Sequence, residues 1–496
     1  MPLYLTMKQA EQKEPAAASY PAFWPVLTAI FIGSFVGMYH VVSLNVSLPG
    51  FIRIFGTELQ TVQWMMTGFT LASGIVVPIT GYAMERFGCK RLFLFAIGGI
   101  TVSSFLCALS WNVGALIAFR IVQGLFCGLI QPVSLALIYR TIRPEKQSFS
   151  LSVWSFSTVL GTAIGPSLSG WLQSFDWHLI FLVTVPVGFV AWIVGAIVIP
   201  KDSANGLARL DWPGLLLATG GSLALLLLFG NMTVWGWNSL LTWAMLLVGV
   251  GSFALFIWQA PRSDHPLLQL RLLLNPRFSL SLTASLILSF GLYSVVYFMP
   301  LLLVEMKGLS PFRVGLLFLP AAACLTAATF AAGKWYRKAG PAKLIMIGCA
   351  ILVVSTYYFS QMPPETSLIA IIVWLAIRNI GTGLASTPTT NASMSSVPEE
   401  WIGHASALLN WLRQVFSAMA LGLCTSLFYS RLSVHLADSG GGEEGTKAYS
   451  LAYMHSIHDV FFVSSIIVAC AIPIALLLGR RMPAPPLTTP KESESL

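Results

Sequence analysis

"GYAMERFGCKR", residues 81–91, and "GKWYRKAGPAK", residues 333–343, decide the fold that this sequence predicts. Each stretch has two glycines seven positions apart among basic residues, and each follows a long apolar run. The second begins 252 residues after the first, and "RNIGTGLA" from Arg378 loosely repeats "RIVQGLFCG" from Arg120 at a similar offset. Two related halves of this size indicate a duplicated unit of six helices.

The composition is that of a membrane protein that crosses the bilayer many times. Of 496 residues, 56% are hydrophobic and only 9% are charged, whereas a soluble domain carries about 25% charged residues. The net charge of +9 is spread along the chain rather than gathered into one basic face, so we expect no nucleic-acid partner. The seven cysteines are scattered singly, without metal-ligand spacing, so we expect neither a metal site nor a cofactor.

The apolar runs predict an all-α fold with fourteen transmembrane helices. About 20 apolar residues span the hydrocarbon core as a helix, whereas barrel strands would alternate over about ten residues. The predicted helices are 24–48, 62–83, 92–110, 114–139, 149–172, 178–199, 212–231, 239–260, 278–304, 312–333, 343–361, 367–390, 402–429 and 459–479. Two six-helix bundles therefore leave 212–231 and 239–260 as extra helices between them.

The charge distribution predicts the orientation and the domain organisation. With the N-terminus in the cytoplasm, the tails and inner loops hold twenty Lys and Arg and the outer loops five, so both termini are predicted to be cytoplasmic. The predicted parts are a tail (1–22), a bundle (23–200), a linker with the extra helices (201–277), a second bundle (278–480) with a long, flexible outer loop (430–458), and a tail (481–496).

Six motifs resemble the major facilitator superfamily. Residues 81–91 resemble its G-x-L-x-D-R-x-G-R-K signature, "RIVQGLFCG" its helix 4 motif, and "GTAIGPSLSGWL" from Gly161 its helix 5 antiporter motif. "VQWMMTGFTL" from Val62, "WHLIFLVTVPVG" from Trp177 and "GHASALLNWLRQ" from Gly403 are similar to the fourteen-helix drug:proton antiporters. The resemblance implies the major facilitator fold and a monomeric, non-enzymatic exporter in a bacterial plasma membrane.

Two of these motifs have a physical interpretation of their own. The first motif predicts a gating latch, because the preference for basic residues on the cytoplasmic side explains its Lys and Arg but not its acidic residue. The residues of this predicted latch are Gly81, Glu85, Arg86, Gly88, Lys90 and Arg91. The second predicts a close packing seam with a proline kink, and the resemblance implies that this seam favours antiport: Gly161, Gly165, Pro166 and Gly170.

Three arginines, Arg120, Arg378 and Arg413, fall inside predicted helices. A charge at mid-bilayer costs about 2.5–3.5 kcal/mol on insertion scales, so it usually has a function or a partner. Either each arginine ties neighbouring helices together, or it lines the transport pathway. The predicted substrate cavity comprises these arginines and polar or large apolar neighbours: Trp64, Met65, Arg120, Gln123, Trp154, Arg378, Asn410, Trp411, Arg413 and Gln414.

None of the nineteen Asp and Glu residues falls in the middle of a predicted helix. The family's helix 1 motif, L-D-x-T-I-V-N-V-A-L-P, aligns with this chain through Asn45, Val46, Leu48 and Pro49, so that its acid falls on His40. A histidine titrates near 6.5, so His40 is a candidate proton carrier. Alternatively it is a neutral, hydrogen-bonded imidazole, or proton coupling is lost or has moved to Glu305.

The leading functional hypothesis is a secondary transporter that exports small amphiphilic molecules by alternating access in exchange for protons. Arginines without a compensating acid favour neutral, zwitterionic or anionic amphiphiles over cations. The alternatives are a dedicated lipid, siderophore or metabolite transporter with altered proton coupling, and a transporter-like membrane sensor. An enzyme is not expected, and His455, His458 and Asp459 are interpreted as a solvated helix start rather than a metal site.

Overall fold

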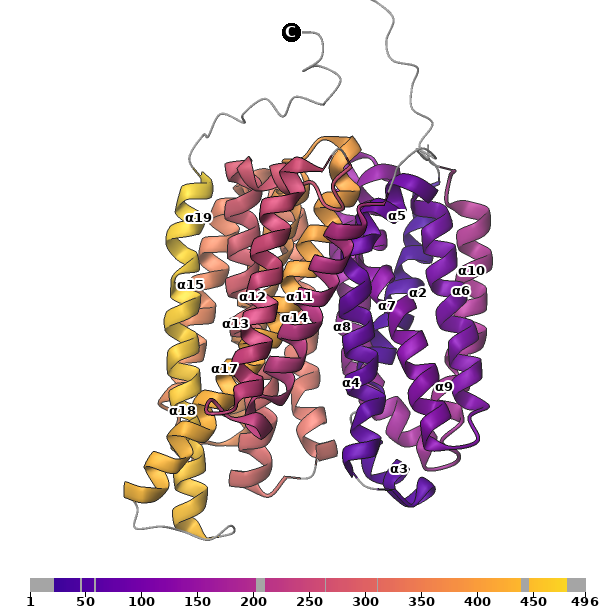
Figure 1. Cartoon of the computed structure of the whole chain (residues 1–496). Helices are drawn as coiled ribbons and strands as arrows, with labels where there is room; N and C mark the ends of the chain where they lie inside the picture. The colour runs from indigo at the N-terminus through magenta and orange to yellow at the C-terminus, as the bar shows by residue number, and fades with distance from the viewer. Residues whose placement is uncertain are drawn as a thin grey trace, which may run out of the picture.

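The structure, a computed structural model, describes residues 22–44, 47–57, 59–201, 210–263, 265–309, 311–438 and 446–479. Regular secondary structure in these residues is helical. Long helices run side by side between two faces of the molecule (Figure 1). We call the face at which α2 (Phe23–Val42) begins and α19 (Ala471–Gly479) ends the terminal face, and the other the opposite face.

The helices form two halves with a hairpin between them. The N-terminal half comprises α2, α3 (Leu48–Phe55), α4 (Leu59–Val76), η1 (Val77–Ile79), α5 (Thr80–Phe87), α6 (Cys89–Ala108), α7 (Val113–Thr141), α8 (Pro144–Gln173), α9 (Leu179–Leu182) and α10 (Thr184–Val198). The hairpin comprises α11 (Trp212–Trp235) and α12 (Leu240–Gln259), followed by η2 (Ala260–Arg262) and η3 (Leu270–Leu274). The C-terminal half comprises α13 (Pro276–Lys307), α14 (Pro311–Ala339), α15 (Pro341–Ser360), α16 (Leu368–Met394), η4 (Glu399–Trp401), α17 (Ile402–Asp438), α18 (Lys447–Ala469) and α19.

Thirteen spans in the described residues are long and apolar enough to cross a membrane. They account for every predicted segment except 149–172, which lies in α8. This helix is 30 residues long, but it is rich in serines that are buried in the protein, such as Ser152, whose hydroxyl donates to the carbonyl of Thr329 (2.9 Å). Because α8 packs between α2 and α14, its polar groups bond to protein rather than meeting lipid.

Three predicted boundaries are wrong. In one case a helix ends before its apolar run does, and in the other two a helix continues where charge predicts a loop. The helix predicted over 24–48 ends at Val42, and Pro49 lies in the first turn of the separate helix α3. The loop predicted at 81–91 is the end of α5 and the start of α6, with only Gly88 between them. Gly88 has φ of +84°, which an L side chain rarely adopts.

The long outer loop predicted over 430–458 is largely helical. Helix α17 continues to Asp438 and α18 begins at Lys447, while residues 439–445 lie outside the described chain. Asp459, expected at a helix end, lies inside α18 and pairs with Arg431 (2.9 Å) and His435 (3.0 Å) of α17. The two helices are therefore joined to each other near the opposite face.

One buried apolar cluster spans both halves at the terminal face, where the C-terminal half also has two smaller clusters of its own, around Ile345 and Leu344. One cluster joins α5, α7 and the α11–α12 hairpin to the first turns of α13 and α17. Nearer the opposite face, separate clusters form around Phe51 and Ile180 in the N-terminal half and around Phe298 and Phe428 in the C-terminal half. The two halves are thus packed together at one face.

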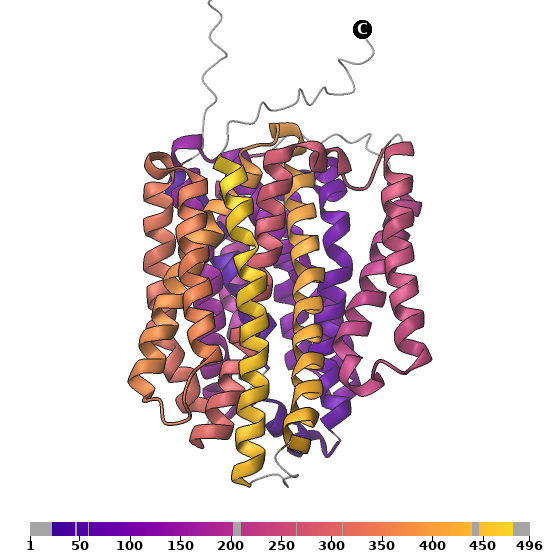
Figure 2. The same cartoon turned by 90° about the vertical axis from the view of Figure 1, so that its left-hand side faces the viewer.

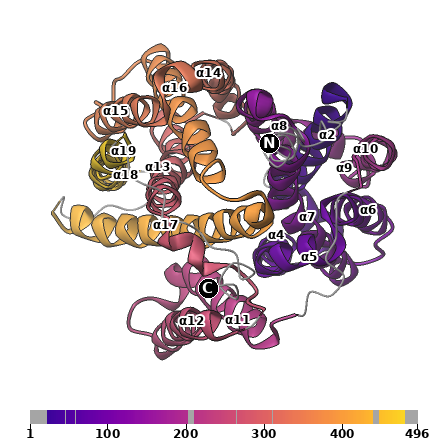
Figure 3. The same cartoon turned by 90° about the horizontal axis from the view of Figure 1, so that it is seen from above.

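The α11–α12 hairpin stands at the edge of the molecule (Figure 2). Seen from above, it lies beside α17, which crosses between the halves (Figure 3). Helix α11 contacts α4 of the N-terminal half and α17 of the C-terminal half. The hairpin therefore bridges the seam on this side, while α8 and α14 meet across it on another side.

Candidate functional site

A buried hydrogen-bond network in the N-terminal half surrounds Arg120 of α7. Its guanidinium donates from Nε to the carbonyl of Met65 in α4 (3.2 Å) and from Nη2 to the carbonyl of His40 in α2 (3.1 Å). Nη1 donates to Oε1 of Gln123 (2.6 Å). Nε2 of Gln123 donates to Oγ of Ser104 in α6 (2.7 Å), which lies 3.0 Å from Nε2 of His40. Arg120 therefore ties four helices together, directly or through Gln123.

Donor and acceptor chemistry orients the Gln123 amide but leaves two arrangements for the imidazole. Arginine only donates, so the oxygen of the Gln123 amide faces Arg120 and its NH2 group faces Ser104. The hydroxyl of Ser104 has one hydrogen and two lone pairs, so it can donate to Nε2 of His40 or accept from it, and the contact fits either neutral tautomer. Nδ1 is buried and has no hydrogen-bond partner. In a doubly protonated imidazole, Nε2 would donate to Ser104.

The remaining predicted cavity residues of this half differ in exposure. Arg120 stacks on the ring of Phe69, with 4.0 Å between its Cζ atom and the ring centroid, and both are buried. Met65 is buried as well, while Trp64 is 46% exposed. Trp154 of α8 is buried, and its Nε1 has no hydrogen-bond partner. Trp154 is the buried donor in α8 that a ligand could satisfy.

The C-terminal half places two arginines on its inner helices. Arg413 of α17 donates from Nε to Oγ of Ser285 in α13 (2.5 Å) and from Nη2 to Oγ1 of Thr390 in α16 (2.7 Å). Arg378 of α16 is buried and donates to the carbonyl of Gly291 in α13. Of the three arginines inside the spans, Arg413 is the partly exposed one. Arg378 therefore braces two helices, whereas Arg413 joins three helices through hydroxyl groups and keeps part of its side chain exposed.

Within the described part of the chain, none of these three arginines has a carboxylate within ion-pair distance. Their hydrogen-bond acceptors are carbonyls, hydroxyls and one amide, all of them neutral. The interior of both halves is therefore electrically positive. An anion that enters would gain charge-assisted hydrogen bonds, whereas a cation would be repelled.

The predicted residues beside Arg413 point in different directions. Asn410 donates to the carbonyl of Ser406 one turn earlier in α17 (2.9 Å). Gln414 reaches across the seam and donates to Ser73 of α4 (3.1 Å). Trp411 lies against the α11–α12 hairpin: it is buried, donates to Ser222 (2.6 Å) and stacks on Phe253.

At the terminal face, polar contacts join the two halves, and the Glu85 side chain is the most exposed of the groups involved. Nε2 of His404 in α17 lies 3.2 Å from Oε2 of Glu85 in α5. The hydroxyl of Tyr139 donates to Oδ1 of Asn391 (2.6 Å), whose Nδ2 donates to Oγ of Ser148 (2.7 Å). This set of contacts, which we call the terminal latch, connects α5, α7 and α8 to α16 and α17.

The residues of the predicted gating motif lie around this latch. A Cβ atom at Gly81 would lie 3.0 Å from Nδ1 of His404, so glycine lets α17 approach α5. Lys90 donates to the carbonyl of Ala196 in α10 (2.7 Å). Arg86 is half-buried and Arg91 exposed. Within this motif, Glu85 and Gly81 reach the other half.

The predicted antiporter motif packs against the helical turn that carries His40. A Cβ atom at Gly161 of α8 would lie 3.1 Å from the carbonyl oxygen of Phe35 and 3.3 Å from the amide nitrogen of Tyr39. One at Gly165 would lie 2.6 Å from Val42. Pro166 lies inside α8, and Gly170 is half-buried further along it. The motif thus brings α8 onto α2 on either side of His40.

Glu305 lies far along α13, towards the opposite face. It accepts a hydrogen bond from Ser450 of α18 (3.4 Å). Glu305 therefore lies in the C-terminal half near the opposite face, whereas His40 and the Arg120 network lie in the N-terminal half. In the residues described, no group of three or more His, Cys, Asp or Glu side chains could hold a metal ion.

Sequence reasoning missed Ser104, Asn391 and His404. Ser104 stands in an apolar run without any motif, so nothing in the sequence signals its contact with His40. Asn391 and His404 flank the polar stretch "ASMSSVPEEWIG", 392–403. A histidine directly after the glycine that opens the "GHASALLNWLRQ" motif was the available signal, because such a group near a helix start is placed to meet a partner.

The comparisons with known proteins agree with this architecture. The profile described as the Major Facilitator Superfamily matches residues 30–422. The chain belongs to the major facilitator superfamily. The predicted fold class is therefore confirmed, and the chain is a multi-pass membrane transporter rather than a member of an enzyme family.

Several bacterial relatives of this transporter are named for drug resistance. The "multidrug resistance protein B homolog" of Mycobacterium tuberculosis H37Rv is 30% identical over 405 residues, which cover 80% of this chain and 74% of that protein. The "probable multidrug resistance protein EmrY" of Escherichia coli K12 is 28% identical over 427 residues, covering 85% and 83%. The human organic anion transporter MFSD10 shares the fold, with a TM-score of 0.65 at 15% identity over 92% of this chain and 100% of that one.

Proposed function

We propose that this transporter exports small amphiphilic molecules by alternating access in exchange for protons. The observation that carries the proposal is the unequal packing of its halves. They share one apolar core and the terminal latch at the terminal face, and they have separate cores at the opposite face. Alternating access needs two rigid halves whose contacts can be exchanged from one face to the other, and this arrangement corresponds to one end state.

The nature of the cargo is supported by the relatives and by the charge of the interior. Relatives whose names refer to drug resistance favour export of drug-like molecules. Arg413 is partly exposed, bonds to the hydroxyls of Ser285 and Thr390, and has no carboxylate partner among the described residues. This combination favours neutral, zwitterionic or anionic amphiphiles over lipophilic cations. A dedicated lipid, siderophore or metabolite exporter is the second candidate, because the same positive, partly exposed group would serve an anionic metabolite.

We propose His40 as the proton carrier. It occupies the position of the acid in the family's helix 1 motif, and its backbone carbonyl accepts from Arg120. A second proton on the imidazole would make Nε2 a donor to Ser104 and place a second positive charge beside Arg120. Repulsion between these two charges would weaken the contact between α2 and α7. Proton binding would therefore change the packing of helices in the N-terminal half.

The test is flux in vesicles of the purified transporter with an imposed pH gradient. We expect uptake of an amphiphilic drug into inside-acidic, inverted vesicles, accompanied by proton release. His40→Gln should abolish proton release and reduce uptake at least tenfold, because its amide cannot carry the proton. Glu305→Gln should leave both proton release and drug uptake within about twofold of the wild-type values.

The control is facilitated drug equilibration without a gradient, which His40→Gln should retain if its fold is intact. Full proton-coupled uptake by His40→Gln would contradict the role of His40, and its loss in Glu305→Gln would move the coupling site there. Drug binding without any flux in the unmodified protein would contradict the transport proposal and favour a sensor. The domain bounds, the cytoplasmic termini and the monomeric state remain predictions within this proposal.

A further inference from the structure

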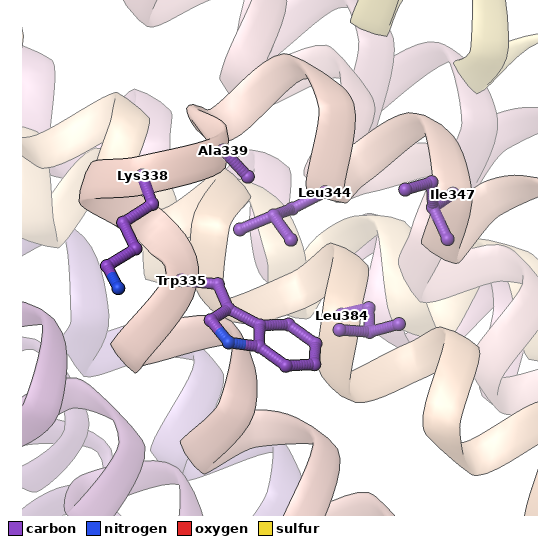
Figure 4. A pocket seen from close by; sticks show the side chains of 6 residues that line it. All are labelled: Trp335, Lys338, Ala339, Leu344, Ile347 and Leu384. Carbon is purple, nitrogen blue, oxygen red and sulfur yellow. The ribbon is translucent and has the colours of Figure 1, made fainter.

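A cavity of about 350 Å³ opens on the surface of the C-terminal half, at the terminal ends of three helices (Figure 4). Its lining comes from the last turns of α14, the first turns of α15, and α16: Trp335, Lys338, Ala339, Leu344, Ile347 and Leu384. A volume of this size lies in the range of pockets that bind small ligands. The cavity plays no part in the transport pathway described above.

The lining combines an apolar wall with a single cation. Figure 4 shows Leu344, Ile347 and Leu384 grouped on one side of Lys338, whose nitrogen points away from them. Trp335 and Ile347 are each 50% exposed, which is unusual for such large apolar side chains unless lipid covers them. Because α14 and α15 are membrane spans that meet at the terminal face, the cavity lies at the membrane–water boundary, where Trp and Lys are enriched.

The segment 333–343, which supplies three of the lining residues and which we call the rim, is basic. Lys334, Arg337 and Lys343 are exposed on the same turns as the lining residues, and residues 333–343 contain no acid. Basic pockets between transmembrane helices bind the headgroups of anionic lipids. An apolar groove with this rim therefore fits an amphiphile whose polar end is negative.

We propose that this cavity binds one anionic phospholipid of the leaflet at the terminal face. Its acyl chain lies against Trp335, Leu344, Ile347 and Leu384, and its phosphate lies beside Lys338. The inference does not depend on the cargo or on proton coupling, because the cavity faces the surrounding bilayer and not the seam.

A lipid in this cavity would affect the conformation of the transporter, because the cavity lies at the end of α14 that contacts the N-terminal half. Gly333 is on the neighbouring turn of α14, where a Cβ atom would lie 2.9 Å from the carbonyl oxygen of Ser148 in α8. The same end of α14 thus meets α8 across the seam and meets α15 and α16 at the cavity. A bound lipid holds this end of α14 in place and favours the closed terminal face.

The test uses Trp335 as its own reporter. Full-length protein in phosphatidylcholine nanodiscs receives increasing mole fractions of brominated phosphatidylglycerol or brominated phosphatidylcholine, which quench nearby tryptophans. The difference between the wild type and Trp335→Phe isolates the quenching of Trp335. We expect this quenching to saturate at low phosphatidylglycerol and to exceed that by phosphatidylcholine at least threefold at equal mole fraction.

Two variants and one control separate the site from general lipid contact. Lys338→Gln should remove the preference for phosphatidylglycerol, and Ala339→Leu, which fills the cavity, should remove the saturable phase even if Lys338→Gln folds poorly. Lys201→Gln removes an exposed lysine near the terminal face outside the cavity, and it should leave the preference unchanged. Quenching proportional to mole fraction and equal for both lipids would overturn the proposal. Loss of quenching as the protein self-associates would overturn it in favour of a second copy of the chain.

Discussion

The three intramembrane arginines are of two kinds, which differ in burial and in their hydrogen-bond acceptors. Arg120 and Arg378 are buried and bonded to backbone carbonyls of neighbouring helices, and backbone carbonyls are among the partners that intramembrane charges have. Arg413 is held by two hydroxyls and is partly exposed. A hydroxyl is a weaker partner for a guanidinium than an anion is, so Arg413 can exchange a hydroxyl for a ligand.

Replacement of Arg413 should therefore change the charge preference of the transporter. We expect Arg413→Gln to weaken binding of a naphthalenesulfonate probe about 10- to 100-fold, as expected from loss of a hydrogen bond to a charged group worth about 1.5–3 kcal/mol. The matching neutral sulfonamide should bind within twofold of its wild-type affinity. Equilibrium fluorescence titration measures both. Equal losses for the two probes would indicate a structural role for Arg413.

The Asn391 amide is the centre of the terminal latch. Asn391→Ala leaves the hydroxyls of Tyr139 and Ser148 buried without this partner, at about 1–3 kcal/mol for each unsatisfied group. We therefore expect the conformation with a closed terminal face to be destabilised by that free energy relative to the conformation with an open terminal face. Spin labels on Glu145 and Lys343, one in each half, should show a larger population at long distance. Asn231→Ala is the control, because Asn231 bonds within its own helix (2.9 Å), and it should leave the distances unchanged.

At the scale of helices, close packing through glycine decides which elements meet. The antiporter motif allows α8 to lie on α2 beside His40, and Gly333 allows α14 to lie on α8 at the terminal face. Helix α8 thus touches both halves, which explains why its sequence is rich in serine rather than uniformly apolar. A polar helix in a membrane protein indicates burial among other helices.

Two glycines of α14 give a matched test of this packing. Gly333→Ala would place a methyl group 2.9 Å from a backbone oxygen of α8, whereas Gly315→Ala meets nothing within 4 Å. We expect Gly333→Ala to lower the melting temperature and the transport rate, because α14 must move away from α8. Gly315→Ala should be neutral or stabilising by about 0.5–1 kcal/mol through its helix propensity. Similar effects of both variants would contradict the packing argument.

For the whole molecule, the distribution of Lys and Arg predicts the orientation. The terminal face carries most of the basic residues, and the positive-inside rule places it in the cytoplasm. In a cysteine-free background, Glu365→Cys at the opposite face should react with a membrane-impermeant maleimide in intact cells. Lys201→Cys at the terminal face should react only after permeabilisation. Both residues are exposed, so the reverse pattern would show the opposite orientation.

Much of the architecture follows from local pattern. Each of the fourteen predicted segments overlaps a helix, including the segment in α8, which is too polar for a hydropathy criterion. The same reasoning predicted loops at 81–91 and 430–458, because charged residues end an apolar run without ending a helix. Hydropathy reports where lipid ends, whereas backbone hydrogen bonding continues into water, as it does in α5 and α17.

The sequence by itself determined the class of protein and the family, and it predicted two duplicated halves and a histidine, His40, at the position of the family's acid. These depend on residues close together in the chain, whose spacing and hydropathy are visible without a structure. The tertiary structure alone decided that His40 belongs to the Arg120 network, that Glu85 meets His404, and that Arg413 is partly exposed while Arg120 and Arg378 are buried. These facts join residues up to 319 positions apart, and helix packing rather than local sequence sets which of them come together.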